Sequence, residues 1–115
     1  MKMKHLNLVL LFLLFNPNIV ISSSESKRDK IQQIDSLLRL SSKASFDVDI
    51  DNSLKYAFEA LSQSQSVNYA GGKMVAANMI GQAMYNTGNY KEAVEYLTIA
   101  ENIKTKENRS LTLSQ

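Results

Sequence analysis

One seven-residue stretch, Lys55-Tyr56-Ala57-Phe58-Glu59-Ala60-Leu61, is echoed by Lys91-Glu92-Ala93-Val94-Glu95-Tyr96-Leu97, at an offset of 36 positions. Lysine, alanine, glutamate and leucine recur at the same places in both. A period between about 20 and 50 residues is typical of stacked repeats, in which each unit buries its apolar face against its neighbours. Because such arrays usually bind other molecules, the echo predicts a repeat protein whose function is binding.

The N-terminal segment, residues 1–24, has the features of a leader that precedes the folded domain. Lys2 and Lys4 make the start basic, residues 8–15 are an unbroken apolar run, and Asn16-Pro17-Asn18 is expected to interrupt any helix before a polar linker at 22–26. This order is that of a secretory signal peptide. We therefore expect residues 1–24 to be cleaved and the protein to be exported, either to the periplasm or out of the cell. The alternative is an uncleaved membrane anchor, although the apolar stretch is shorter than the roughly 20 residues that span a bilayer.

Composition limits the kinds of function that the chain can have. Its 115 residues have room for one domain. The net charge of +2 comes from Lys2 and Lys4, so the rest of the chain is balanced and nucleic acid is not an expected partner. The one histidine, His5, lies in the leader and there is no cysteine, which removes the usual general base, thiol nucleophile and transition-metal ligands. We predict a protein that is not an enzyme and has no cofactor, catalytic residue or metal site.

Two short motifs are similar to ligand-binding loops but lack essential residues. Asp47, Asp49 and Asp51 match the opening of a calcium-binding EF-hand loop, yet Phe58 stands where that loop needs a bidentate glutamate. The Gly-Gly-Lys run at 71–73 lacks the first glycine of a phosphate-binding loop. We interpret the first as an acidic loop before a helix and the second as part of a turn.

Apolar residues recur at spacings of three and four along most of the remaining chain, which is the pattern of amphipathic helices. We expect four helices, at about 27–41, 53–66, 73–87 and 90–104. Asp51 or Ser53 is the expected N-cap of the second helix, and residues 67–72 and Gly88 are expected in turns. The alternating residues 46–50 are too short a segment to form a sheet. The predicted fold class is all-α, with tandem antiparallel helical hairpins.

The third and fourth expected helices resemble a tetratricopeptide repeat. The resemblance is carried by Ala77, Ile80-Gly81, Met84-Tyr85, Gly88-Asn89-Tyr90, Ala93, Leu97 and Ala100. The sequence departs from the family pattern at Ala77, where tryptophan is common, and at Thr105, where a helix-ending proline is common. The resemblance implies an α-solenoid fragment with a degenerate hairpin at 27–66, a second hairpin at 73–104 and the start of a further repeat at 107–115.

Small and large residues have distinct expected places in this packing. Gly81 and Ala93 are small where the two helices of a hairpin cross, and Tyr90 is large where the hairpin needs filling. The full set of expected repeat-packing residues is Ala57, Leu61, Ala77, Ile80, Gly81, Tyr90, Ala93, Leu97 and Ala100. Leu111 and Leu113 are expected to open a truncated helix, which would leave an apolar face uncapped and favour self-association.

A polar stripe on the third helix is the candidate binding feature. Asn78, Gln82 and Asn86 recur every fourth residue, with Val75 and Tyr85 beside them. In the tetratricopeptide family the first helix of each hairpin lines a peptide-binding groove, so the resemblance makes these five residues groove candidates. Primary amides both donate and accept, which suits the backbone of an extended peptide. The alternative is a helix face that is only solvated. The absence of lysine and arginine from the stripe disfavours an acidic peptide tail.

Two functions follow from these observations. In the first, the protein is an exported, non-catalytic module that binds a peptide or another protein. The second rests on a similarity, in the order of leader, Ile34-Asp35-Ser36-Leu37-Leu38 helix and repeats, to the N-terminal sensor arrays of Bacteroidetes-type tetratricopeptide receptors, which precede a membrane span and a histidine kinase or DNA-binding domain. In that case the chain is the truncated extracytoplasmic sensor portion of such a receptor, with no independent activity. A membrane is an expected partner only in that case or if the leader is uncleaved.

Overall fold

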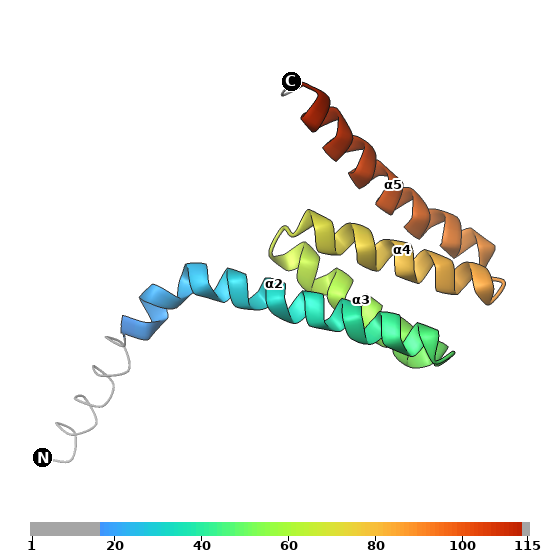
Figure 1. The fold of residues 1–115 in the computed structure, drawn as a ribbon, viewed down its shortest axis with the longest axis horizontal. Coiled ribbons are helices and arrows are strands. Elements are labelled where there is room, and N and C mark those ends of the chain that lie inside the picture. The colour runs from blue at the N-terminus through green and yellow to red at the C-terminus, as the bar shows by residue number, and fades with distance from the viewer. Residues whose placement is uncertain (1–16, 114–115) are drawn as a thin grey trace, which may run out of the picture.

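The structure, a computed structural model, describes the backbone of residues 17–113 and the side chains of residues 26–113. It contains four helices: α2 (Pro17–Phe46), α3 (Ile50–Ser66), α4 (Ala70–Asn86) and α5 (Tyr90–Leu113). Each helix packs against the next, and α2 also contacts α4. Figure 1 shows α5 crossing α4 near their shared turn and then diverging from it. No strand occurs in the described range, so the expected all-α fold class of packed helical hairpins is confirmed.

The N-terminal part of α2 is longer than expected. Residues 1–16, which hold most of the predicted signal peptide, lie outside the described residues, and residues 17–24 are helical. The expected polar linker at 22–26 is wrong, because α2 runs through it. Proline is tolerated in the first turn of a helix, where its missing N–H needs no partner, and serine costs a helix only a few tenths of a kcal/mol. None of the helices in the described part of the chain combines the length and apolarity that a membrane span requires.

Three nearly identical turns join the four helices. In each turn the middle residue is left-handed, with φ of 61° at Val48, 56° at Asn68 and 87° at Gly88. The next N–H donates to a carbonyl in the last turn of the preceding helix, at 2.8 Å for Asp49–Ala44, 2.9 Å for Tyr69–Ser64 and 2.8 Å for Asn89–Met84. This is the Schellman arrangement, which satisfies carbonyls that would otherwise be orphaned at the helix end.

The spacing of the turns corrects the expected period of 36. The left-handed residues Val48, Asn68 and Gly88 follow one another at equal intervals of twenty positions, so equivalent points of successive hairpins are forty positions apart. The difference of four positions from the expected period is about one helical turn, which returns to the same face of the helix. The amphipathic pattern therefore looks alike at either offset. Burial fits both offsets, because Ala93 is buried and so are Ala57 and Ser53, its counterparts at 36 and 40 positions. The positions of the turns select the longer period.

The helix ends near the first two turns also differ from the expected ones. The gap between the first two expected helices, at about 42–52, is only 47–49 in the structure. The buried Ser41 hydroxyl donates to the Ser53 carbonyl at 2.8 Å. Asp49, rather than Asp51 or Ser53, is the N-cap of α3, and its carboxylate accepts from the Asn52 N–H at 3.3 Å. Gly72 lies inside α4 rather than in a turn. A Cβ there would lie 3.0 Å from Ile34 Cγ2, so the glycine lets α4 approach α2 closely.

The C-terminal helix does not end where expected. α5 runs unbroken from Tyr90 to Leu113, so residues 107–113 extend the same helix and do not open a new one. Neither glycine nor proline lies between Tyr90 and Leu113. Position 105 is threonine, where a proline would have ended the helix. The expected end near Lys104 is therefore wrong.

The core is built largely from small residues. It lies between α2, α3 and α4 and consists of Ile34, Leu38, Ala57, Ala60, Leu61, Ala76 and Ile80. Alanine and glycine at helix crossings let the backbones come close together, and close packing then depends on each methyl group. Beside this core the Tyr69 hydroxyl donates to the Asp35 carboxylate at 2.9 Å, which ties the α3–α4 turn to α2.

This hydrogen bond predicts a loss of stability at alkaline pH. The Asp35 hydrogen bond, burial and the negative charge of Asp35 raise the pKa of the Tyr69 phenol above its ordinary value of 10.0. A raised pKa means that folding favours the protonated phenol, so its contribution is complete below pH 10 and is lost as the pH rises through the higher value. Urea denaturation across this range should show the wild type losing more stability than Tyr69→Phe. An equal loss in both proteins would contradict the assignment.

Candidate functional site

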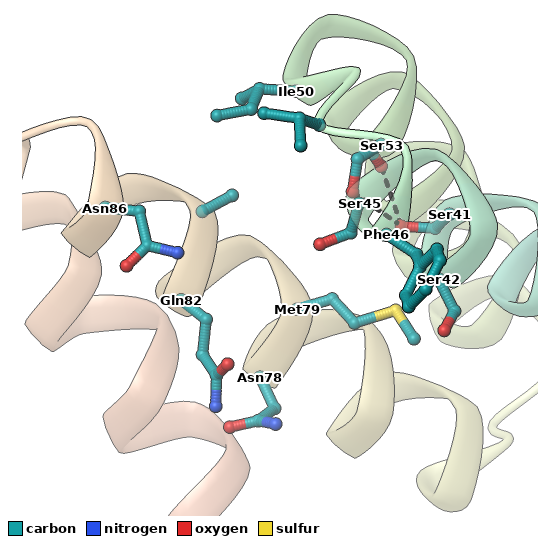
Figure 2. Close-up of a pocket in the computed structure, with 12 residues that line it drawn as sticks. Ser41, Ser42, Ser45, Phe46, Ile50, Ser53, Asn78, Met79, Gln82 and Asn86 are labelled. Carbon is teal, nitrogen blue, oxygen red and sulfur yellow. Dashed lines mark hydrogen bonds between the residues drawn. The ribbon is translucent and has the colours of Figure 1, made fainter.

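A groove of about 550 Å³ lies between the C-terminal half of α2 and one face of α4. Its α2 wall continues through the first turn into the start of α3. Figure 2 shows Asn78, Gln82 and Asn86 along α4, with Ser42, Phe46 and Ile50 across from them. The complete lining is Ser41, Ser42, Ser45, Phe46, Val48, Ile50, Ser53, Asn78, Met79, Gln82, Ala83 and Asn86. The groove thus joins the first helices of the two hairpins.

The three amides of the predicted stripe share one wall of this groove. Asn78, Gln82 and Asn86 are all exposed and follow one another at four-residue intervals along α4, which places them on one face. None of their side chains is hydrogen-bonded to another residue of the described chain, whereas Thr87 and Asn89 just beyond them are. The stripe therefore offers free donors and acceptors to the groove.

The two flanking candidates do not line the groove. Val75 borders a neighbouring depression on α4 and α5, which is also lined by Asn78, Leu97 and Ala100. Tyr85 is 60 % exposed, and its ring packs edge-on against Tyr90 with centroids 5.3 Å apart. Among the five groove candidates, the three amides line the groove, and neither Val75 nor Tyr85 does.

Most of the expected packing residues are at helix contacts. Ala57, Ala77, Ile80, Gly81 and Ala93 are buried, as are Leu61 and Ala100. A Cβ at Gly81 would lie 2.6 Å from the half-buried Leu97 side chain and 3.2 Å from the Ala93 carbonyl oxygen. The prediction for Tyr90 is wrong. It is 60 % exposed as the first residue of α5, and its ring covers Tyr85 rather than filling the hairpin.

The opposite wall of the groove was missed by the sequence analysis. Phe46, Val48 and Ile50 all line it, together with Ser42 and Ser45, although this segment was interpreted as a loop or as an acidic helix cap. The available signal was the alternation of apolar and acidic residues over 46–51. The contact between α2 and α4 connects segments that are far apart in the sequence, so local periodicity could not predict it.

The groove is lined by uncharged side chains. Every lining side chain is a hydroxyl, a primary amide, a thioether, an alkyl or an aromatic group, and none is charged. Such groups can donate and accept hydrogen bonds and cover apolar atoms. They provide no titratable side chain within the groove for general acid–base chemistry.

Comparison of this chain with protein-family models, with curated proteins and with solved structures gave no match.

Proposed function

We propose that the protein is a non-catalytic, tetratricopeptide-type module that binds an extended peptide, or an extended segment of a protein, in the groove between α2 and α4. The observation that carries this proposal is the row of unpartnered amides on Asn78, Gln82 and Asn86 along one wall of that groove. Because these amides are exposed and have no partner in the described chain, they are available to hydrogen-bond a ligand that enters the groove.

The spacing of the amides suits an extended peptide. Four residues of an α-helix rise about 6 Å, and two residues of an extended chain advance about 6.6 Å. Successive amides along α4 therefore face every second peptide unit of an extended backbone. Each primary amide can accept an N–H and donate to a C=O of that backbone, which gives contacts that do not depend on the ligand's side chains.

The length of the hairpin differs from that of the family it resembles. The hairpin of this chain is longer than the roughly 34 residues of a tetratricopeptide repeat. The stacked hairpins, the close Gly81–Ala93 crossing and the contact between first helices support the proposal at the level of architecture. Exported protein, as the leader predicts, would meet its ligand outside the cytoplasm. If the chain is instead the sensor portion of a receptor, the same groove would receive the peptide or protein that acts as the signal.

The double variant Asn78→Ala, Gln82→Ala tests the groove. A random-peptide display library is selected on the immobilised protein, and the most enriched peptide is synthesised with a fluorophore. If each of the two amides loses one hydrogen bond with a net contribution of about 0.5–1.5 kcal/mol, the double variant should bind this peptide roughly 5- to 150-fold more weakly. Circular dichroism should be unchanged, because both side chains are exposed.

Glu92→Ala provides the matched control. Glu92 is exposed on α5 and does not line the groove, so its removal should leave peptide affinity unchanged. Two results would contradict the proposal: a library that enriches no peptide, or an equal loss of affinity in Glu92→Ala and in the amide variant.

A further inference from the structure

Large apolar side chains are exposed together at the first turn. Phe46 is 89 % exposed and Val48 is 79 % exposed, while Ile50 is half-buried. All of them line the groove, on the wall opposite the amides. Single exposed apolar residues are ordinary, but a group that lines a concave surface is typical of a place where a ligand is covered.

Val48 occupies its position at a conformational cost. It is left-handed, with φ of 61°, at the place in the turn where the other turns have Asn68 and Gly88. Glycine and asparagine tolerate this conformation, whereas for a β-branched residue it is a true outlier. Since the Val48 side chain is 79 % exposed, its contacts within the described chain offset little of this conformational free energy. Contact with a ligand would explain why an apolar side chain stands there.

The charges around this apolar group have one prevailing sign. Asp47, Asp49 and Asp51 alternate with the apolar residues and are exposed, and they do not line the groove. Lys43 pairs with Asp47 at 3.8 Å. No residue in the described part of the chain forms an ion pair with Asp49 or Asp51. The rim beside the apolar group is therefore negative and complements a cationic ligand.

We propose that Phe46, Val48 and Ile50 form an anchor site for one apolar side chain of the bound peptide, and that lysine or arginine residues flank this side chain and face Asp47, Asp49 and Asp51. The inference rests on the proposed function, because it concerns the same groove. It adds the chemical class of the ligand: an extended basic–apolar–basic segment whose backbone lies along the amides of α4.

Four fluorescein-labelled peptides test this ligand class. They share glycine–serine ends and differ at the centre, which is Lys-Leu-Lys, Glu-Leu-Glu, Ser-Leu-Ser or Lys-Ser-Lys. Fluorescence anisotropy should show the Lys-Leu-Lys peptide binding roughly tenfold more tightly than Glu-Leu-Glu at low salt, since exposed charge pairs each contribute modestly. The preference should shrink in high salt, which screens exposed charges. Lys-Ser-Lys should bind more weakly than Lys-Leu-Lys.

Val48→Gly separates the anchor from the stability of the fold. It relieves the left-handed strain, so its thermal midpoint should rise by several degrees, while its affinity for Lys-Leu-Lys should fall severalfold. Asn68→Gly changes the equivalent position of the next turn and should leave binding unchanged. Asp47→Asn with Asp51→Asn should reduce the preference for Lys-Leu-Lys over Ser-Leu-Ser, while Asp49 keeps its charge and its role as helix cap.

The outcomes distinguish this inference from the proposed function. Equal or tighter binding of Glu-Leu-Glu, unchanged binding by Val48→Gly, or a lower thermal midpoint in Val48→Gly would each overturn the anchor site. If none of the four peptides binds but a library-selected peptide binds and depends on Asn78 and Gln82, the anchor inference is wrong and the proposed function stands. If no peptide from either source binds, both are wrong.

Discussion

Ile34→Ala should destabilise the protein by about 2–5 kcal/mol, the range for removing a fully buried isoleucine side chain. Ile34 is 0 % exposed and belongs to the cluster that joins α2 to α3 and α4. A loss of this size is a large part of the stability of a small domain and should lower the thermal midpoint by roughly 10 °C or more. Because α2 and α4 supply the two walls of the groove, peptide binding should weaken as the α2 contact loosens.

Leu40→Ala is the matched control for Ile34→Ala. Leu40 lies on the same helix but is 44 % exposed, so less apolar surface is returned to water and no enclosed cavity forms. Its thermal midpoint should stay close to that of the wild type. Similar midpoints for the two variants would show that α2 does not pack on α4 through the Ile34 face.

Gly81→Val should be the most damaging change at the α4–α5 crossing. Even a Cβ at this position would lie 2.6 Å from Leu97 Cγ and 2.7 Å from Leu97 Cδ2, and valine adds two further methyl groups. Valine exceeds glycine in helix propensity by only roughly a few tenths of a kcal/mol, whereas overpacking typically costs about 1–3 kcal/mol and sometimes more. The steric effect wins, so denaturation should show a net loss of about 2 kcal/mol or more. Ala93→Leu, which fills the same crossing, should also destabilise.

A double-mutant cycle tests whether Leu97 causes this clash. In a Leu97→Ala background the obstructing side chain is gone, and Gly81→Val should cost markedly less than in the wild type. The coupling free energy is expected within the range of about 0.5–3 kcal/mol found for residues in contact. Additive effects, with no coupling, would show that Gly81 and Leu97 do not meet and that the two helices cross elsewhere.

The class of fold could be predicted because every level of the sequence favours the same answer. Apolar spacing, the lack of strand signals and the small residues at Ala77, Gly81 and Ala93 all favour close-packed helices. The repeat period was predicted less accurately than the fold class. The expected and observed offsets differ by about one helical turn, so both place equivalent residues on the same helix face. The turns would have given the period, but only Gly88 carries the usual left-handed residue. The equivalent turn at Val48 could not be predicted from the sequence, because valine rarely adopts the left-handed conformation.

The part of the candidate site that lies on α4 could be predicted, but the wall that α2 and the first turn contribute could not. The amides of Asn78, Gln82 and Asn86 share a face because of local geometry alone, and they do line the groove. Tyr85 was expected beside them because it is close in sequence, but its side chain leaves the helix in a different direction and its ring packs against Tyr90. Phe46 and Val48 reach the groove through the packing of α2 on α4, which depends on contacts between distant residues such as Ile34 and Gly72.

Side-chain amide signals in nuclear magnetic resonance test the central claim most directly, namely that an extended peptide lies along the amides of α4. The labelled protein is titrated with the library-selected peptide, and the NH₂ resonances are assigned by comparison with the alanine variants. The account predicts that the NH₂ signals of Asn78, Gln82 and Asn86 shift together and saturate at the affinity measured by fluorescence. Control signals from Asn102 and Asn108 on exposed parts of α5 should stay in place. Saturable binding that shifts the α5 amides and leaves the three α4 amides unmoved would contradict the claim.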